Sequence, residues 1–346
     1  MSERKIHCLN VGQGDSFILE RDSGRVTIID ICCGNLDIKK VAEAKYVKPP
    51  GDYGMRDKPT NPVDYLTSKG ISEIWRFILT HPDMDHMDGI KRLFAQKTVS
   101  HFWDCGIRKK KPDFSGGIYL EEDWDYYEDL INGKVTSTKV ISPRAGDNGK
   151  FWNCDNDDGN GQGDCIAIIA PNKELVDSAN EIGDGNDASY VIVYRSTAGP
   201  VIFAGDSHDK TWEYILKHHK DIVQNAAVLF APHHGRKSAP RDFSFLDIVN
   251  PRISFFGCAP SEHLAYGAWN SRDLLFFTNN QCGNIHVYPV AEDIQVFIEN
   301  YNYAKDYTGG ETYAKDGYWF LCQLPKQNKE IVNGNRVQAI LRNRQA

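Results

Sequence analysis

The chain has 346 residues, with 41% hydrophobic and 25% charged residues, which is the composition of a globular protein and excludes collagen, a coiled coil or a disordered tail. Its net charge of -7 does not favour general attraction to nucleic acid or anionic lipid. No apolar run approaches the ~20 residues that span a bilayer, and the N-terminus lacks the apolar segment of a signal peptide, so we expect a cytoplasmic protein without a membrane partner.

The first half of the chain predicts strands followed by one strand–loop–helix unit. Alternating or apolar segments separated by turn residues predict strands at 5–11, 16–20, 25–31 and 74–79. A surface excursion rich in Pro and Gly is expected at 35–70, and helical spacing at 87–95. The residues after Leu79 therefore lie at the carboxyl end of a strand, where α/β proteins build sites.

The second half predicts an insertion and then a return to regular structure. We expect the insertion at about 100–165, with a helix at 121–131 and a polar loop at 153–164. Beyond it, strands are predicted at 165–170, 190–196, 201–204, 226–231, 252–257 and near 285 and 294, with helices at 210–219 and 272–278. Without an internal repeat or a linker, the chain predicts one α/β domain over 1–300 and a C-terminal appendage over 301–346.

Predicted strands end in side chains that bind metals. These residues are Asp30; His81, Asp83, Asp85 and His86; Asp206; and His233 and His234. Imidazole and carboxylate suit zinc, manganese or iron, and one carboxylate such as Asp206 can bridge two ions. The nine cysteines form no C-x-x-C pair, so we expect reduced thiols and a metal site built from His and carboxylates.

These motifs resemble the metallo-β-lactamase superfamily of metal-dependent hydrolases, in its ComEC-like DNA-uptake branch. The resemblance runs from residue 4 to about 300 and rests on six motifs: Asn10-Val-Gly-Gln-Gly-Asp15-Ser16, Ile29-Asp30, Leu79-Thr-His81-Pro-Asp83-Met-Asp85-His86-Met-Asp-Gly89, Gly185-Asn186-Asp187-Ala-Ser189, Gly205-Asp206 and Pro232-His233-His234-Gly235. It implies an αββα four-layer sandwich, with a site at one edge that holds two divalent metal ions, zinc or manganese. The hairpin turn before Asp15 is expected to let Asp15 and Ser16 support the metal loops.

The chain departs from the superfamily pattern at three places. Asp83 stands where a second His is usual, which makes manganese plausible beside zinc. The usual mid-chain His is missing, and Asn186 or Asp187 occupies its neighbourhood, as a possible metal or substrate residue like Asp30. Ala268 replaces the His of a Tyr-Gly-His-Pro element, whose role His263 is a candidate to take.

The implied mechanism is hydrolysis by hydroxide formed on the ions. Asp85 is expected to bind metal and accept the proton of the nucleophile, and His234 to be a ligand. His233 would contact the phosphoryl oxygen or protonate the leaving group. Lys237 and Ser238, just after the His pair, are candidates to bind phosphate.

The leading functional hypothesis is a phosphodiesterase or nuclease acting on DNA, for instance in defence against foreign DNA. Basic segments that would contact DNA are 108–111, Arg236-Lys237 with Arg241, and the C-terminal arginines Arg336, Arg342 and Arg344. One alternative is a small phosphoester or phosphorylcholine-type ester, caged by aromatic residues of the insertion such as Trp103, Trp124, Tyr126, Tyr127 and Trp152. Another is a metal-binding sensor or recruitment module with little turnover. The sequence identifies no protein partner.

Overall fold

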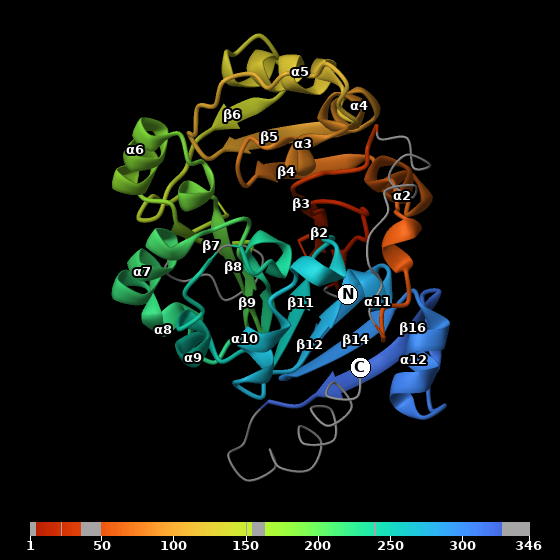
Figure 1. The fold of residues 1–346 in the computed structure, drawn as a ribbon. Helices are drawn as coiled ribbons and strands as arrows, with labels where there is room; N and C mark the ends of the chain where they lie inside the picture. Colours follow the sequence, from red (N-terminus) through yellow and green to blue (C-terminus); the bar gives the residue numbers. More distant parts are fainter. Residues whose placement is uncertain are drawn as a thin grey trace.

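The computed structural model describes residues 5–21, 23–35, 50–149, 151–153, 163–238 and 240–326. Two sheets form its centre (Figure 1). The larger has ten strands in the order β15 (Ala314–Lys315), β16 (Tyr318–Leu324), β14 (Asp293–Ile298), β13 (Ile285–Val290), β1 (Lys5–Cys8), β2 (Phe17–Glu20), β3 (Thr27–Ile29), β4 (Glu73–Leu79), β5 (Thr98–Asp104) and β6 (Lys139–Ile141). The smaller has six, in the order β12 (Phe276–Thr278), β11 (Ile253–Phe256), β10 (Val228–Phe230), β9 (Gly199–Phe203), β8 (Val191–Ser196) and β7 (Ile166–Ala170).

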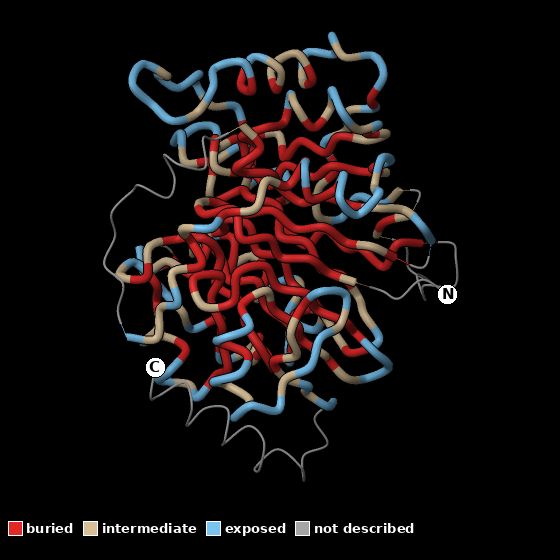
Figure 2. The backbone as a smooth tube through the Cα atoms, turned by 90° about the vertical axis from the view of Figure 1, so that its right-hand side faces the viewer, coloured by how far each residue is buried: buried red, intermediate tan, exposed pale blue. Residues whose placement is uncertain are grey.

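The two sheets pack face to face through one apolar core. Phe17 of β2 contacts Phe203 of β9 and Phe230 of β10, with ring centroids 5.3 and 4.7 Å apart. Every second side chain of these strands points into this layer, as the two-residue period of a strand requires. Figure 2 shows the strands as the buried centre of the molecule.

Helices cover the outer face of each sheet, so the architecture is the four-layer αββα sandwich that the sequence led us to expect. A second core lies between the ten-stranded sheet and α2 (Pro62–Ser68), α3 (Met84–Met87), α4 (Ile90–Gln96) and α5 (Glu121–Ile131). A third lies between the six-stranded sheet and α7 (Asp209–His218), α8 (Lys220–Val223), α9 (Phe245–Val249) and α10 (Tyr266–Asn270). The remaining described α-helices are α6 (Lys173–Ile182), α11 (Asn279–Cys282) and α12 (Tyr301–Thr308). No described helix has the length and apolar character that crossing a membrane requires.

Most predicted elements are confirmed, and one is wrong. The expected helix at 272–278 is not formed: the chain leaves α10 at Asn270, Asp273 takes a left-handed conformation with φ of 51°, and residues 276–278 form β12. Phe276 and Phe277 pair with β11 and are buried, so sheet packing overrides the apparent helical spacing. The predicted helix at 87–95 is two helices, because Gly89, at φ of 94°, separates α3 from α4.

The predicted insertion and appendage both contribute to the ten-stranded sheet. Between 100 and 165, β5 and β6 extend one end of the sheet and α5 covers it. At the opposite end, β16 pairs with β14, and Tyr303 and Ala304 of α12 join the core shared by the sheets. The domain boundaries themselves stay predictions. The eight described cysteines are free thiols.

Candidate metal centre

The carboxyl ends of four strands meet at one edge of the sandwich. β3 and β4 run parallel in one sheet, and β9 and β10 run parallel in the other. The residues that follow these strands therefore lie together where the sheets face one another. A hydrogen bond of 3.0 Å from the backbone nitrogen of Tyr190 to the carbonyl of Thr80 joins the two sheets at this edge.

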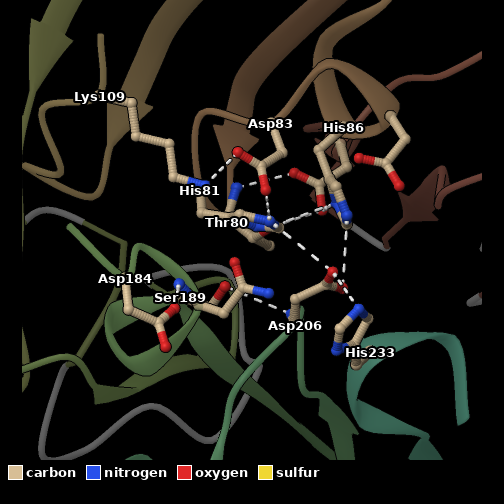
Figure 3. Close-up of polar contacts among 12 residues, drawn as sticks. Thr80, His81, Asp83, His86, Lys109, Asp184, Ser189, Asp206 and His233 are labelled. Atoms are coloured by element: carbon tan, nitrogen blue, oxygen red, sulfur yellow. Dashed lines mark hydrogen bonds and ion pairs between the residues drawn. The ribbon is translucent and has the colours of Figure 1, made fainter. Parts of the chain in front are cut away.

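The loop after β4 is held in place by its own apolar anchors and by the neighbouring strand. Met84 and Met87 of α3 are buried in the core beneath the loop. The backbone nitrogen of Ile31 donates a hydrogen bond of 2.9 Å to the carbonyl of His86. The polar side chains between these anchors are thereby turned toward the space between the sheets (Figure 3).

Three buried histidines and one carboxylate converge there. His86 Nε2 lies 3.4 Å from Asp206 Oδ1, His234 Nε2 lies 3.6 Å from the same oxygen, and His81 Nε2 lies 3.8 Å from Asp206 Oδ2. Asp85 Oδ2 lies 3.6 Å from His234 Nε2. The groups His81–His86–Asp206 and Asp85–His86–His234 each place their donor atoms within 4.8 Å of one another.

The donors of this cluster fit a divalent cation. The Nε2 atoms of His81, His86 and His234, and Oδ1 of Asp206, are buried without a hydrogen-bond partner among the described residues. Buried polar atoms rarely lack a partner, so several such atoms aimed at one point indicate a cation-binding arrangement. Imidazole nitrogen with carboxylate oxygen is a donor set suited to zinc, manganese or iron.

Two further carboxylates hold the histidine rings from behind. Asp30 Oδ2 lies 2.8 Å from His86 Nδ1, and its oxygens accept hydrogen bonds from the backbone nitrogen and hydroxyl of Thr80 at 2.7 and 2.6 Å. Asp15 Oδ2 lies 3.1 Å from His234 Nδ1. Such contacts fix the tautomer and direct Nε2 toward the centre. Asp30, a candidate ligand by sequence, thus has its oxygens engaged by Thr80 and His86.

The histidines and carboxylates of the cluster shift one another's pKa toward the charged forms. Burial alone lowers the pKa of His86, but the carboxylates of Asp206 and Asp30 raise it well above the ordinary value. Burial likewise opposes the charge of His234, whereas Asp15 and Asp206 raise its pKa to about 10. Although burial raises the pKa of Asp206, the histidines, His234 first, hold it well below its usual range. The protein chain itself therefore keeps the carboxylate of Asp206 ionised.

His233 lies beside the cluster and continues into a chain of polar residues. Its Nε2 is 3.7 Å from Asp206 Oδ2, and its Nδ1 is 3.3 Å from His208 Nε2. His208 Nδ1 is in turn 3.6 Å from Asp184 Oδ2. Burial is the main cause that lowers the pKa of His233 to about 4.

The mid-chain residues Asn186 and Asp187 are not brought into the cluster. Asn186 Nδ2 lies 3.3 Å from His208 Nε2, and Asp187 Oδ2 lies 4.0 Å from Lys210 Nζ. Both belong to the short 3₁₀ helix η2 (Asn186–Ala188). Through His208, which also contacts His233, Asn186 is connected to the cluster.

The carboxylate of Asp83 forms an ion pair with a lysine, Lys109. Its Oδ1 forms an ion pair with Lys109 Nζ, and its Oδ2 lies 3.4 Å from His81 Nε2 (Figure 3). Burial raises the pKa of Asp83, but the neighbouring His81 and Lys109 bring it below its ordinary value. The remainder of the basic segment is largely paired as well: Arg108 binds Asp104 at 2.8 Å.

The predicted phosphate-binding residues lie on an exposed loop after the His pair. Lys237 and Ser238 are exposed, as is His263. The backbone nitrogen of Lys237 donates a hydrogen bond of 2.8 Å to the carbonyl of His263, so the two loops lie side by side. The C-terminal arginines Arg336, Arg342 and Arg344 fall outside the described residues.

Three residues of the site have left-handed backbones. Asp30, His233 and His234 have φ of 57°, 51° and 57°. Non-glycine residues avoid this region, and such conformations cluster at functional sites because the surrounding structure enforces them. The adjacent His residues thereby present their rings to different neighbours, His234 to Asp85 and His233 to His208.

A cavity of about 720 Å³ lies elsewhere, beside β4, β5 and β6. Its lining includes Trp75, Arg76 and Lys139, and none of the metal cluster. Two residues suggested for a cation–π cage, Trp103 and Trp152, line it, whereas Trp124 packs in the core beneath α5. Its tryptophans therefore do not adjoin the metal-binding atoms.

Sequence reasoning missed two contributors to the site and assigned a third differently. Thr80 supports Asp30, and His208 contacts His233. The neighbouring motifs, Thr-His81 and Asp206-Ser-His208, were the available signals. Lys109 was assigned only to a basic segment, and nothing in the sequence pairs it with Asp83.

Comparison with known proteins yields structural similarity only. No family model matches the sequence, and no curated protein matches it significantly. Similar solved structures include Igni18, a metallo hydrolase from the archaeon Ignicoccus hospitalis, with a TM-score of 0.43 and 14% identity over 82% of this chain and 98% of that one. YhfI, a metallo-β-lactamase fold protein from Bacillus subtilis, has a TM-score of 0.44 and 11% identity over 79% and 96%. A diphosphatase from the PhnP family has a TM-score of 0.37 and 12% identity over 75% and 89%. At scores and identities this low, no activity is transferred from these proteins.

Proposed function

We propose that this chain is a metal-dependent hydrolase of phosphoesters, and that its substrates are phosphodiesters of the nucleic-acid type. The observation that carries the proposal is the convergence of His81, His86 and His234 on Asp206, with their donor atoms buried and unpartnered among the described residues. A divalent cation held there supplies Lewis acidity, which activates water and neutralises charge on a phosphoryl group.

We assign the residues of the cluster to metal binding, proton transfer and phosphoryl contact according to their positions. Asp85, His86, His234 and Asp206 are the proposed ligands of one ion, and His81 with Asp83 the candidates for a second. The side chain of Asp85 is 23% exposed, so it can also accept the proton of the attacking water. His233 Nε2 lies 3.7 Å from Asp206 Oδ2 and is assigned to the phosphoryl oxygen or the leaving group.

A nucleic-acid substrate is supported by the loop that follows the His pair. Arg236 and Lys237 come directly after Gly235, and Arg241 is exposed nearby. Basic side chains in such a loop can bind the phosphates of a nucleic-acid backbone, whatever its base sequence. Part of the acidic excess of the chain belongs to the cluster itself and would be neutralised by cations.

The test is hydrolysis of bis(p-nitrophenyl) phosphate and of single-stranded DNA, double-stranded DNA and RNA, with Mn²⁺ or Zn²⁺ added. We expect turnover by the wild type and a loss of about 100-fold or more in Asp206→Asn, because the shared carboxylate is removed. Asp221→Asn, an exposed position on α8, is the matched control and should retain full activity.

Equal activity of the wild type and Asp206→Asn on every substrate would contradict the proposal. Turnover of bis(p-nitrophenyl) phosphate without binding or cleavage of any nucleic acid at low salt would retain the hydrolase and exclude the nuclease.

A further inference from the structure

The two sides of the metal cluster differ in the availability of their carboxylates. On one side, His86 and His234 face Asp206 Oδ1, and Asp85 lies with these two histidines in one group. On the other, His81 and His233 face Asp206 Oδ2 at 3.8 and 3.7 Å, and the added carboxylate, Asp83, is already ion-paired with Lys109. The amide nitrogen of Asn186 lies 3.3 Å from His208 Nε2.

The side with Asp83 already contains a cation that belongs to the chain. Lys109 Nζ is ion-paired with Asp83, the carboxylate that an ion at this side would require (Figure 3). The lysine side chain is 24% exposed, so it is not sealed off from solvent.

The approach of Lys109 is fixed by its surroundings. The preceding residue, Arg108, donates its backbone N–H to Asn180 Oδ1 at 2.8 Å, and Asn180 Nδ2 donates to the carbonyl of Gly106 at 3.1 Å. The side chain then passes over Gly185, where a Cβ would lie 2.6 Å from Lys109 Cε. A residue larger than glycine at 185 would therefore displace the lysine.

We propose that the Lys109 ammonium takes the place of a second metal ion in this chain. The site then binds one divalent ion tightly, at Asp85, His86, His234 and Asp206, and Lys109 is the second positive group that meets a substrate phosphoryl oxygen. This inference rests on the proposed function, because it concerns the same site.

The physical basis is competition between two cations for one carboxylate. A divalent ion at His81 and Asp83 would have to displace the ammonium or share Asp83 with it, and like charges at such a distance repel strongly in a partly buried site. An ammonium with free N–H groups is also a donor that binds phosphate oxygens.

The experiment measures Mn²⁺ binding to the purified full chain by equilibrium dialysis and by electron paramagnetic resonance, in which two neighbouring Mn²⁺ ions give an exchange-coupled spectrum. We expect the wild type to bind one equivalent tightly and a second about tenfold or more weakly, with no coupling at one equivalent. Lys109→Met should bind the second equivalent about tenfold more tightly than the wild type and show coupling. Lys110→Met, which removes the same charge at the adjacent exposed position, should behave as the wild type.

Gly185→Ala provides a second variant that keeps the lysine and its charge. It should strengthen binding of the second equivalent in the same direction, because the added Cβ moves Lys109 away from Asp83. Equal affinities for both ions in the wild type, or a weak second site unchanged in both Lys109→Met and Gly185→Ala, would overturn the inference. In either case Asp206-dependent binding and hydrolysis would persist, whereas absence of any Asp206-dependent Mn²⁺ binding would overturn the proposed function itself.

Discussion

Some carboxylates at this site orient a histidine, and others face the metal-binding nitrogens. Sequence spacing alone does not distinguish the two roles. Asp30 and Asp206 each follow a strand, yet Asp30 supports His86 from behind and Asp206 faces three imidazoles. The difference arises from Thr80, whose N–H and hydroxyl engage Asp30. A sequence places both carboxylates at strand ends, but only the backbone path after the strand decides which way each side chain points.

The contact of Lys109 with Asp83 could not be predicted from local sequence either. Its contact with Asp83 depends on where the loop after β5 returns, and on the small size of Gly185 in a different segment. Local pattern could place Lys109 in a basic run, and that run suggested a nucleic-acid strip. Long-range packing instead pairs the lysine with the metal loop.

A second pair of histidines, His7 on β1 and His286 on β13, is buried in the ten-stranded sheet. Neither belongs to a group of potential metal ligands among the described residues. His7 and His286 are opposite one another on β1 and β13, and the hydroxyl of Tyr65 lies 2.8 Å from a nitrogen of each. Glu20 binds His7 at 2.6 Å, and Tyr318 stacks on His286 with centroids 3.5 Å apart. Three of the four ring nitrogens therefore have a hydrogen-bond partner.

Burial of these two histidines predicts loss of stability in acid. Burial lowers the pKa of both His7 and His286 in the folded chain, in His286 with further contributions from His7, Lys5 and Lys69. An unfolded imidazole titrates near ~6.5, so below that pH the unfolded chain binds protons that the folded chain does not. The free energy of unfolding should therefore fall with decreasing pH, by up to about 1.4 kcal/mol per pH unit for each histidine.

Urea unfolding between pH 7.5 and 5, approximately the range in which an unperturbed imidazole titrates, measures this slope. His286→Gln should make the slope shallower by about 1 kcal/mol per pH unit, since one of the two groups is removed. His218→Gln, at an exposed position on α7, serves as the comparison and should leave the slope unchanged. An unchanged slope in His286→Gln would show that this histidine does not resist protonation.

At the scale of elements, the turn between β1 and β2 packs directly on the metal loop. Gly14 has φ of 77°, and a Cβ there would lie 1.8 Å from the carbonyl oxygen of Asp85. Gly14 also forms an isolated β-bridge with Cys258. The turn is therefore held between the six-stranded sheet and α3, and its backbone sets the position of Asp85.

Gly14→Ala should both destabilise the fold and weaken metal binding. We expect a loss of about 3 kcal/mol in the free energy of unfolding, from backbone strain and from displacement of Asp85, with Mn²⁺ affinity lower by about tenfold or more. Gly24→Ala is a close control, because Gly24 has φ of 74° with no atom within 4 Å of the added Cβ.

The control should cost only about 1 kcal/mol and leave Mn²⁺ affinity unchanged. Chemical denaturation and equilibrium dialysis measure the two quantities. Equal losses in the two variants would show that the turn does not position Asp85.

Helices and strands with a clear apolar periodicity could be predicted from the sequence. A strand that forms only because it pairs with a strand distant in the sequence could not. The helix at 121–131 was expected with its observed bounds, because Trp124, Tyr127 and Leu130 mark one buried face. The segment 272–278 has no strand alternation, and its apolar run is buried on the sheet because β11 lies beside it. Neighbouring strands supply information that a local window lacks.

At the scale of the whole molecule, the site exists because both sheets end at the same edge. β3 and β4 supply Asp30 and the loop with His81, and β9 and β10 supply Asp206 and the His pair. Neither sheet alone contains the full donor set. The order of motifs along the chain made this convergence predictable, because each motif followed a strand.

The end of the ten-stranded sheet was less predictable, and it bears on where the folded unit ends. Tyr303, Ala304 and Leu321 are buried in the core shared by the two sheets. β16 pairs with β14 over Ile294 to Ile298. A chain that stops at Asn300 would lose these core residues and leave β14 as an unpaired edge.

We therefore expect the chain ending at Asn300 to aggregate or to unfold at a temperature at least about 10 °C lower than the full chain. The chain ending at Lys326 retains β16 and should keep the melting temperature of the full chain within about 2 °C. Light scattering and calorimetry on the three chains make the comparison. The predicted boundary at residue 300 would be correct if the shorter chain were monodisperse with an unchanged melting temperature, since α12 and β16 would then be dispensable to the sandwich. If it aggregates and the chain ending at Lys326 does not, the unit that carries the metal centre extends through β16.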